Sequence, residues 1–137
     1  LRPDVLLGHD PWKRYRLHPD HRAAGFLTCD ALVAARDPHF FPEHGIAPHR
    51  PGALLLFEAE SPDHAEKVDS LAVAAKIAAL EAHRSQYEST MFISGDPEAA
   101  AAARARFEDE IRDDVAAVGR WAGVAGAERF RLMPTDR

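Results

Sequence analysis

The stretch His18-Pro19-Asp20-His21-Arg22-Ala23-Ala24-Gly25 has the pattern of a helix start. Proline fits the first position of a helix, and the helix dipole favours an acidic residue in the first turn, so we predict that His18 is the N-cap. Positions three apart share one face of a helix, and His18 and His21 should therefore point the same way. The start of this helix is the first place to look for a site.

The same helix start favours metal binding by its histidines. Its partial positive charge disfavours the imidazolium, and neutral imidazole is the form that binds a metal. Asp20 can orient a ring by accepting a hydrogen bond from one of its nitrogens. A short His-x-x-His pattern also occurs by chance, so a plain helix cap with surface histidines is the alternative interpretation.

Two short apolar runs, at residues 4–8 and 53–58, are typical of strands covered on both faces, as in a parallel sheet. Ligands of open α/β sheets bind beyond the carboxyl ends of the strands. His9 and Asp10 follow the first run directly, so they are expected to face the site. Ordinary polarity of a loop at a strand exit explains the same two residues equally well.

Helical periodicity is expected over residues 19–35, 71–87 and from the turn at 95–98 to Trp121. Residues 128–132 alternate apolar and charged side chains, which favours a short edge strand. The second helix has an apolar stripe that we expect to be its buried face, and Val73, Ile77 and Leu80 widen it. The stripe itself consists of Leu71, Ala74, Ala75, Ala78, Ala79 and Ala82.

Several other residues have expected packing or binding roles. Gly25 lowers helix propensity by about 1 kcal/mol relative to alanine, which predicts a close packing contact there. Cys29 is expected to be a small core residue. The two phenylalanines of the proline-rich loop 39–52 should anchor that loop on the core, while Arg14 and Arg16 could meet an anionic group of a substrate.

Composition indicates one ordinary globular domain. The 137 residues are 46% hydrophobic and 28% charged. A net charge of -5 argues against a nucleic-acid partner, which usually meets a basic face. No apolar run approaches the ~20 residues of a membrane span. Cys29 is the single cysteine, so an internal disulfide is excluded and a cytoplasmic location is expected.

Several blocks of the sequence, in order, resemble the PIG-L/LmbE-like zinc-dependent de-N-acetylases, a family that hydrolyses amides of the N-acetylglucosamine (GlcNAc) type. The resemblance implies an α/β fold of the Rossmann-like, doubly wound kind, with a mostly parallel sheet and flanking helices. The blocks are Pro3 to Leu7, His9-Asp10-Pro11, His18 to Gly25, Lys76 to Leu80, Ala82 to Gln86, and Ala127 to Arg131.

One block of that family has no match in this sequence. Members carry an Ala-His-Pro-Asp-Asp type motif that supplies two metal ligands and the catalytic base. We therefore expect residues 1–137 to be the C-terminal part of a single deacetylase domain, inactive as this chain alone.

The resemblance assigns roles at the helix start. It implies that His21 is a ligand of Zn²⁺, that His18 stabilises the developing oxyanion, and that Asp20 fixes the tautomer or orientation of His18. The substrate class is a small amino sugar that loses an N-acetyl group. The alternatives are a non-catalytic metal-binding or interaction module, with His9, His18 and His21 as ligands, or an inactive remnant of the fold. Assembly as a homo-oligomer is left open.

Overall fold

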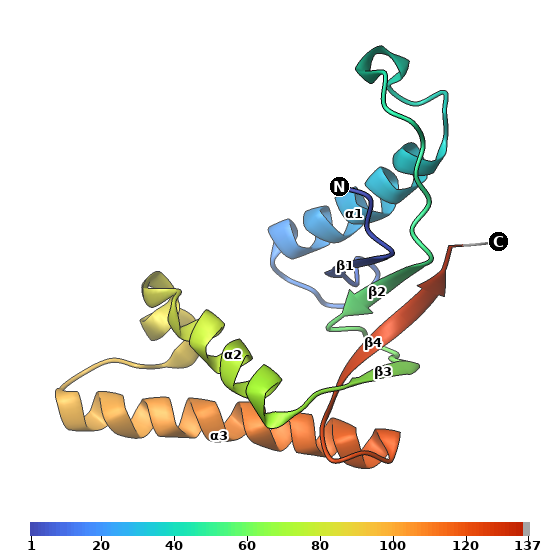
Figure 1. Cartoon of the computed structure of the whole chain (residues 1–137). Helices are drawn as coiled ribbons and strands as arrows, with labels where there is room; N and C mark the ends of the chain where they lie inside the picture. Colours follow the sequence, from blue (N-terminus) through green and yellow to red (C-terminus); the bar gives the residue numbers. More distant parts are fainter. Residues whose placement is uncertain (136–137) are drawn as a thin grey trace. The chain divides into compact units, whose positions relative to one another are not determined.

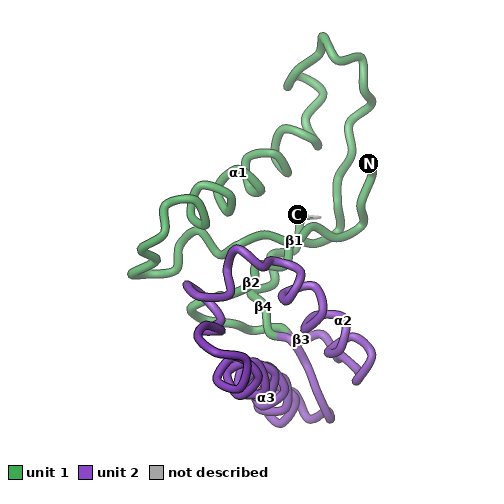
Figure 2. Tube along the Cα trace, turned by 90° about the vertical axis from the view of Figure 1, so that its left-hand side faces the viewer, with its two compact units in different colours: residues 1–64, 129–137 green, residues 65–128 purple. Residues whose placement is uncertain are grey.

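The computed structural model describes residues 1–135. The chain forms two compact units, which Figure 2 shows in green and purple. The first comprises residues 1–64 and the segment from Arg129 onward, and the second comprises residues 65–128. None of the helices in the described residues is long and apolar enough to cross a membrane.

The first unit contains β1 (Val5–His9), α1 (Pro19–Arg36) and β2 (Ala53–Phe57), labelled in Figure 1. β1 and β2 pair in parallel, with Leu7 opposite Leu55. A parallel pair needs a crossover connection, and α1 provides it. The predicted strands and helix agree with these elements to within about one residue at each end.

The sheet has four strands in the order β1-β2-β4-β3, where β3 is His64–Lys67 and β4 is Ala127–Pro134. β4 runs antiparallel to β2. The α/β class is confirmed, with a mixed sheet flanked by helices. The prediction of an edge strand at residues 128–132 is wrong, because β4 lies between two other strands. Its alternating pattern reflects one buried and one open face.

The two apolar strands are buried to different extents. Leu54, Leu55 and Leu56 of β2 are all buried, as predicted. β1 is an edge strand of the sheet, and its Leu7 is 59% exposed. The expectation that β1 is covered on both faces is therefore wrong for the described residues. Cys29 packs against the core cluster of this unit, as predicted.

Gly25 brings α1 directly onto the end of β1. A Cβ atom at Gly25 would lie 2.6 Å from the backbone oxygen of His9 and 3.0 Å from the Cβ of Pro11. The expected close contact is confirmed, and it sets the first turns of α1 beside the residues that leave β1.

The loop after α1 does not pack as expected. It contains a 3₁₀ turn at Pro42–His44, and its phenylalanines, Phe40 and Phe41, are exposed. They line an open hollow against the last turns of α1. The prediction that they anchor the loop on the core is wrong, because their rings face this hollow.

The second unit contains α2 (Ser70–Glu81) and α3 (Pro97–Ala122). Asp69 caps α2 through the backbone N–H of Ala72 (2.9 Å), and Asp96 caps α3. α2 ends earlier than predicted, because a 3₁₀ turn and a π-helical turn follow it at Arg84–Gln86 and Tyr87–Met91.

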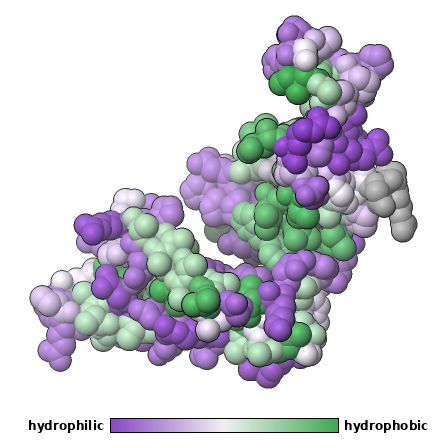
Figure 3. All heavy atoms as spheres, viewed as in Figure 1, coloured by the Kyte–Doolittle hydropathy of each residue, from purple (hydrophilic) through white to green (hydrophobic). Residues whose placement is uncertain are grey.

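The predicted buried face of α2 is wrong for its central stripe and correct for the three residues expected to widen it. All six residues of the expected stripe are exposed, whereas Ile77 is buried and Val73 and Leu80 are half-buried. Figure 3 shows hydrophobic residues along the open side of α2. Alanine is abundant on every side of this helix, so its sequence gives little contrast between faces. On α3, Val115 and Val118 are buried, and Phe107 and Ile111 are half-buried.

Candidate functional site

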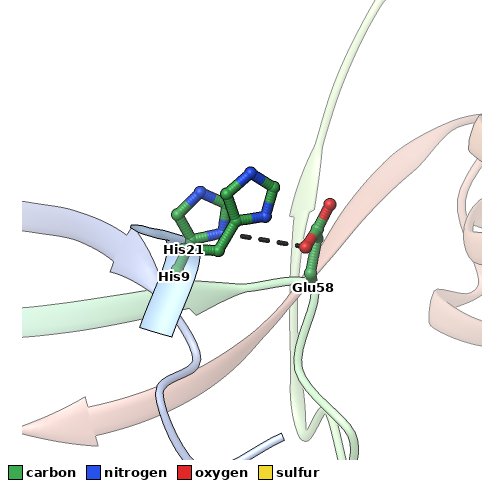
Figure 4. A group of neighbouring side chains, drawn as sticks. All are labelled: His9, His21 and Glu58. Carbon is green, nitrogen blue, oxygen red and sulfur yellow. Dashed lines mark ion pairs between the residues drawn. The ribbon is translucent and has the colours of Figure 1, made fainter. Parts of the chain in front are cut away.

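Three side chains converge where the two parallel strands end. His9 is the last residue of β1, Glu58 follows β2 directly, and His21 lies in the first turns of α1. Each offers one potential metal-ligand atom, and these atoms all lie within 4.8 Å of one another (Figure 4). Nδ1 of His9 is 3.7 Å from Oε2 of Glu58. We call these three residues the donor trio.

The imidazoles at this edge form a stacked row. The ring of His21 stacks on that of His9, with centroids 4.4 Å apart and planes 12° from parallel. His18 also stacks on His21, with centroids 5.0 Å apart and planes 28° from parallel. The prediction that His18 and His21 share a face is confirmed. Phe57 packs against His9 in a tilted contact, with ring centroids 4.3 Å apart.

His18 is the N-cap of α1, as predicted. Its Nδ1 accepts the backbone N–H of Asp20 at 3.3 Å. A nitrogen that accepts a hydrogen bond carries no proton, so the neutral ring has its N–H at Nε2. The contact that orients His18 therefore comes from the backbone of Asp20, and the side chains of both residues are exposed.

Arg16, in the loop between β1 and α1, contacts all three residues of the donor trio. Its Nη1 donates to Oε2 of Glu58 at 2.7 Å and lies 3.2 Å from Nδ1 of His9 and 3.4 Å from Nδ1 of His21. The Arg16 side chain is only 5% exposed. Its partner is Glu58 of the same chain, so this arrangement pairs Arg16 with a protein carboxylate and not with an anionic group of a substrate.

The environment sets the charge of two trio members. Burial is the largest effect on His9 and lowers its pKa, as do the nearby His21 and Arg16, against the opposing charge of Glu58. For Glu58, burial acts to raise the pKa, but the hydrogen bond and charge of Arg16, with smaller help from His9 and Lys13, lower it overall. Neutral His9 beside ionised Glu58 is a donor set suited to a cation.

Asp10 has a structural role at this edge. The residue is 7% exposed, and its carboxylate accepts the backbone N–H groups of Trp12 (3.0 Å) and Glu60 (3.2 Å). It thereby ties the loop after β1 to the loop after β2. Arg14 strengthens this link between the two loops, because its backbone N–H and its side chain both donate hydrogen bonds to Glu60. Of the two interpretations of Asp10, the structure shows the loop-shaping one.

The backbone at Glu58 is strained. Its φ of 51° lies in the left-handed region, which residues other than glycine rarely adopt. Such positions cost about 1–3 kcal/mol and persist where surrounding contacts fix them. Here the carbonyl and carboxylate of Glu58 both accept from Arg16.

Sequence reasoning missed Glu58, and it gave Arg16 a different partner, an anionic group of a substrate. Glu58 follows an apolar strand, so the rule that singled out His9 also points to Glu58. Arg16 carries no such signal, because its partner is 42 residues away in the sequence. The histidines of loop 39–52, which are His39, His44 and His49, do not add to the trio: within residues 1–135, the group of potential ligands contains only His9 and His21 as histidines.

Comparison with known proteins relates the chain to deacetylases. It is 28% identical over 136 residues to the diacetylchitobiose deacetylase of Thermococcus kodakarensis, across 97% of this chain and 46% of that protein. No family model matches. The chain is therefore homologous to a diacetylchitobiose deacetylase.

Solved structures agree with this relation. The N,N'-diacetylchitobiose deacetylase of Pyrococcus horikoshii, solved with an inhibitor, matches with a TM-score of 0.72 and 28% identity, over 98% of this chain and 47% of its own. The conserved protein TT1542 of Thermus thermophilus matches in fold, with a TM-score of 0.66 and 22% identity, over 99% and 54%. The chain spans about half the length of these relatives.

Proposed function

We propose that this chain supplies part of the active site of a zinc-dependent deacetylase that removes an N-acetyl group from a GlcNAc-type amino sugar. One observation carries the proposal: His21 meets two further metal-ligand atoms at the strand ends, in a chain homologous to a diacetylchitobiose deacetylase. The acetylated sugar named for that relative is the model for the substrate class.

The residues present fit a zinc ion. Zinc takes imidazole nitrogen and carboxylate oxygen, and the donor trio offers two of the first and one of the second. His21 is the ligand that the family resemblance assigns, with His9 and Glu58 beside it. When bound, the ion would supply a Lewis acid that polarises the amide carbonyl and makes water a competent nucleophile near neutral pH.

His18 is proposed to stabilise the oxyanion. The N-cap bond from Asp20 leaves its Nε2–H as the donor, and His18 stacks beside His21. A preformed donor toward developing negative charge contributes about 10²-fold or more in rate. This assignment needs no positive charge on His18, because the neutral tautomer already donates.

The proposed reaction also needs a general base. Glu58 is hydrogen-bonded to Arg16, so it is poorly placed to accept a proton from water. The family motif that carries the base has no match in this sequence. We therefore expect the 137-residue chain to bind zinc weakly and to release no acetate by itself. The coding sequence upstream of Leu1 is a direct check, since a motif of the Ala-His-Pro-Asp-Asp type would supply the base.

Substrate binding tests the proposal on the chain as it is. Saturation-transfer NMR with N-acetylglucosamine should show zinc-dependent contact of the acetyl methyl group, and glucosamine should bind much less. His21→Gln should abolish the zinc dependence, and His18→Ala should weaken it. His39→Gln is the matched control, since His39 lies outside the donor trio. Equal binding of the two sugars, unaffected by zinc, would contradict the proposal.

A second candidate is a non-catalytic metal-binding module, favoured by the proximity of His9 to His21 within this one chain. The group of potential ligands contains Glu58 in place of the expected His18. His9→Gln separates the two functions, because it should abolish metal binding by a module whose ligands all lie here. In the enzyme it should only reduce metal affinity.

A further inference from the structure

We propose that the guanidinium of Arg16 is an internal cation that holds the donor trio together and must leave when a divalent metal ion binds. The inference rests on the proposed function and adds to it a form of regulation at the same site. The evidence is positional: one nitrogen, Nη1, lies 2.7, 3.2 and 3.4 Å from one potential ligand atom on each member of the trio, Oε2 of Glu58 and Nδ1 of His9 and of His21.

The guanidinium satisfies this position incompletely. Nη1 carries two N–H groups and lies beside Oε2 of Glu58 and two imidazole nitrogens, so it cannot donate a separate hydrogen bond to all three atoms. The Nε of Arg16 is buried and has no hydrogen-bond partner among the described residues. A buried donor without a partner is unfavourable. Arg16 therefore occupies the position between the ligand atoms with incomplete hydrogen bonding. A metal ion that binds these atoms can displace such a group.

Charge makes the two occupants exclusive. A guanidinium that lies about 3 Å from the ligand atoms would be within close range of a bound dication, and the repulsion there is weakly screened because the Arg16 side chain is nearly fully buried. The flanking Tyr15 has a positive φ of 56° and is exposed, so the segment that carries Arg16 has room to move outward.

Removal of the charge should tighten zinc binding. Arg16→Gln is expected to raise the affinity for Zn²⁺ about tenfold or more, measured by competition with a chromophoric zinc indicator. Arg16→Lys keeps a positive charge and should stay close to the wild-type affinity. Arg14→Gln is the matched control, because it removes an arginine of the same loop that pairs with Glu60 and not with the trio. Circular dichroism confirms that each variant is folded.

A measurement on the wild-type chain covers the case in which Arg16→Gln does not fold. In ¹⁵N NMR, zinc added until the His21 ring signals stop shifting should move the Arg16 Nε signal and speed its exchange with water. Unchanged zinc affinity in Arg16→Gln, or a static Arg16 signal while His21 responds, would overturn the inference and leave the proposed function standing. Failure of His21 to respond to zinc even in Arg16→Gln would overturn both.

Discussion

The contact of Gly25 with the end of β1 predicts that Gly25→Ala damages both the fold and the site. The added Cβ would lie 2.6 Å from the backbone oxygen of His9, which cannot rotate away as a side chain would. Helix α1 must then move outward, and it carries His21 away from His9. The substitution thus acts on the donor trio without changing any of its members.

The magnitude follows from two opposing effects. Overpacking of a well-packed contact costs about 1–3 kcal/mol, and a clash with backbone belongs at the upper end. Alanine returns about 1 kcal/mol through its higher helix propensity. We expect a net loss of about 2 kcal/mol in the free energy of unfolding of the first unit. Zinc affinity should fall about tenfold, as it does when the supports of metal ligands are altered.

Urea unfolding followed by Trp12 fluorescence measures this loss. Trp12 packs edge-on against Phe26, the neighbour of Gly25, at 5.8 Å between ring centroids, so its emission reports on this contact. A Trp121→Phe background removes the signal from the second unit. Gly52→Ala is the control, because its Cβ would lie 3.6 Å from the nearest atom, an ordinary contact. Wild-type stability and zinc affinity in Gly25→Ala would refute the packing argument.

Three further predictions address charge, loop geometry and the exposed strand. Because the folded-state pKa of His9 lies below 6.5, the unfolded chain binds the proton first; stability should fall as the pH drops from about 6.5 through that lowered pKa, and urea midpoints of His9→Gln should fall less over this range. Asp10→Asn puts an amide donor against a backbone N–H, so it should lower the free energy of unfolding by about 1–3 kcal/mol and lower the melting temperature. An unchanged melting temperature would contradict the role of this carboxylate in linking the two loops. Leu7→Lys should leave the melting temperature nearly unchanged, because Leu7 is 59% exposed on an edge strand of the sheet; a clearly lower melting temperature would count against this.

Local signals in the sequence located the elements that frame the site. Pro19 and Asp20 predicted the start of α1, and short apolar runs predicted β1 and β2, because caps and apolar runs are properties of neighbouring residues. The rule that loops after parallel strands face the ligand placed His9 at the site. These features sufficed to predict where histidines gather, and the structure confirms that His18 and His21 share a face.

The remainder depends on residues far apart in the sequence. Strand pairing decides whether β4 is central or at an edge, and the alternation within residues 128–132 is the same in both cases. The open side of α2 could not be predicted, because alanine suits a buried or an exposed helix position alike. Arg16 and Glu58 meet across 42 residues, so neither one by itself indicates the pair.

At position 58, the left-handed backbone conformation and the carboxylate ligand favour different residues. Asparagine adopts such a φ more readily and keeps a carbonyl acceptor for the arginine, so a mutant library selected for folded protein alone should enrich asparagine at position 58. A parallel selection for zinc retention should enrich glutamate instead. The ratio of these two residues between the selections would show which requirement this position serves.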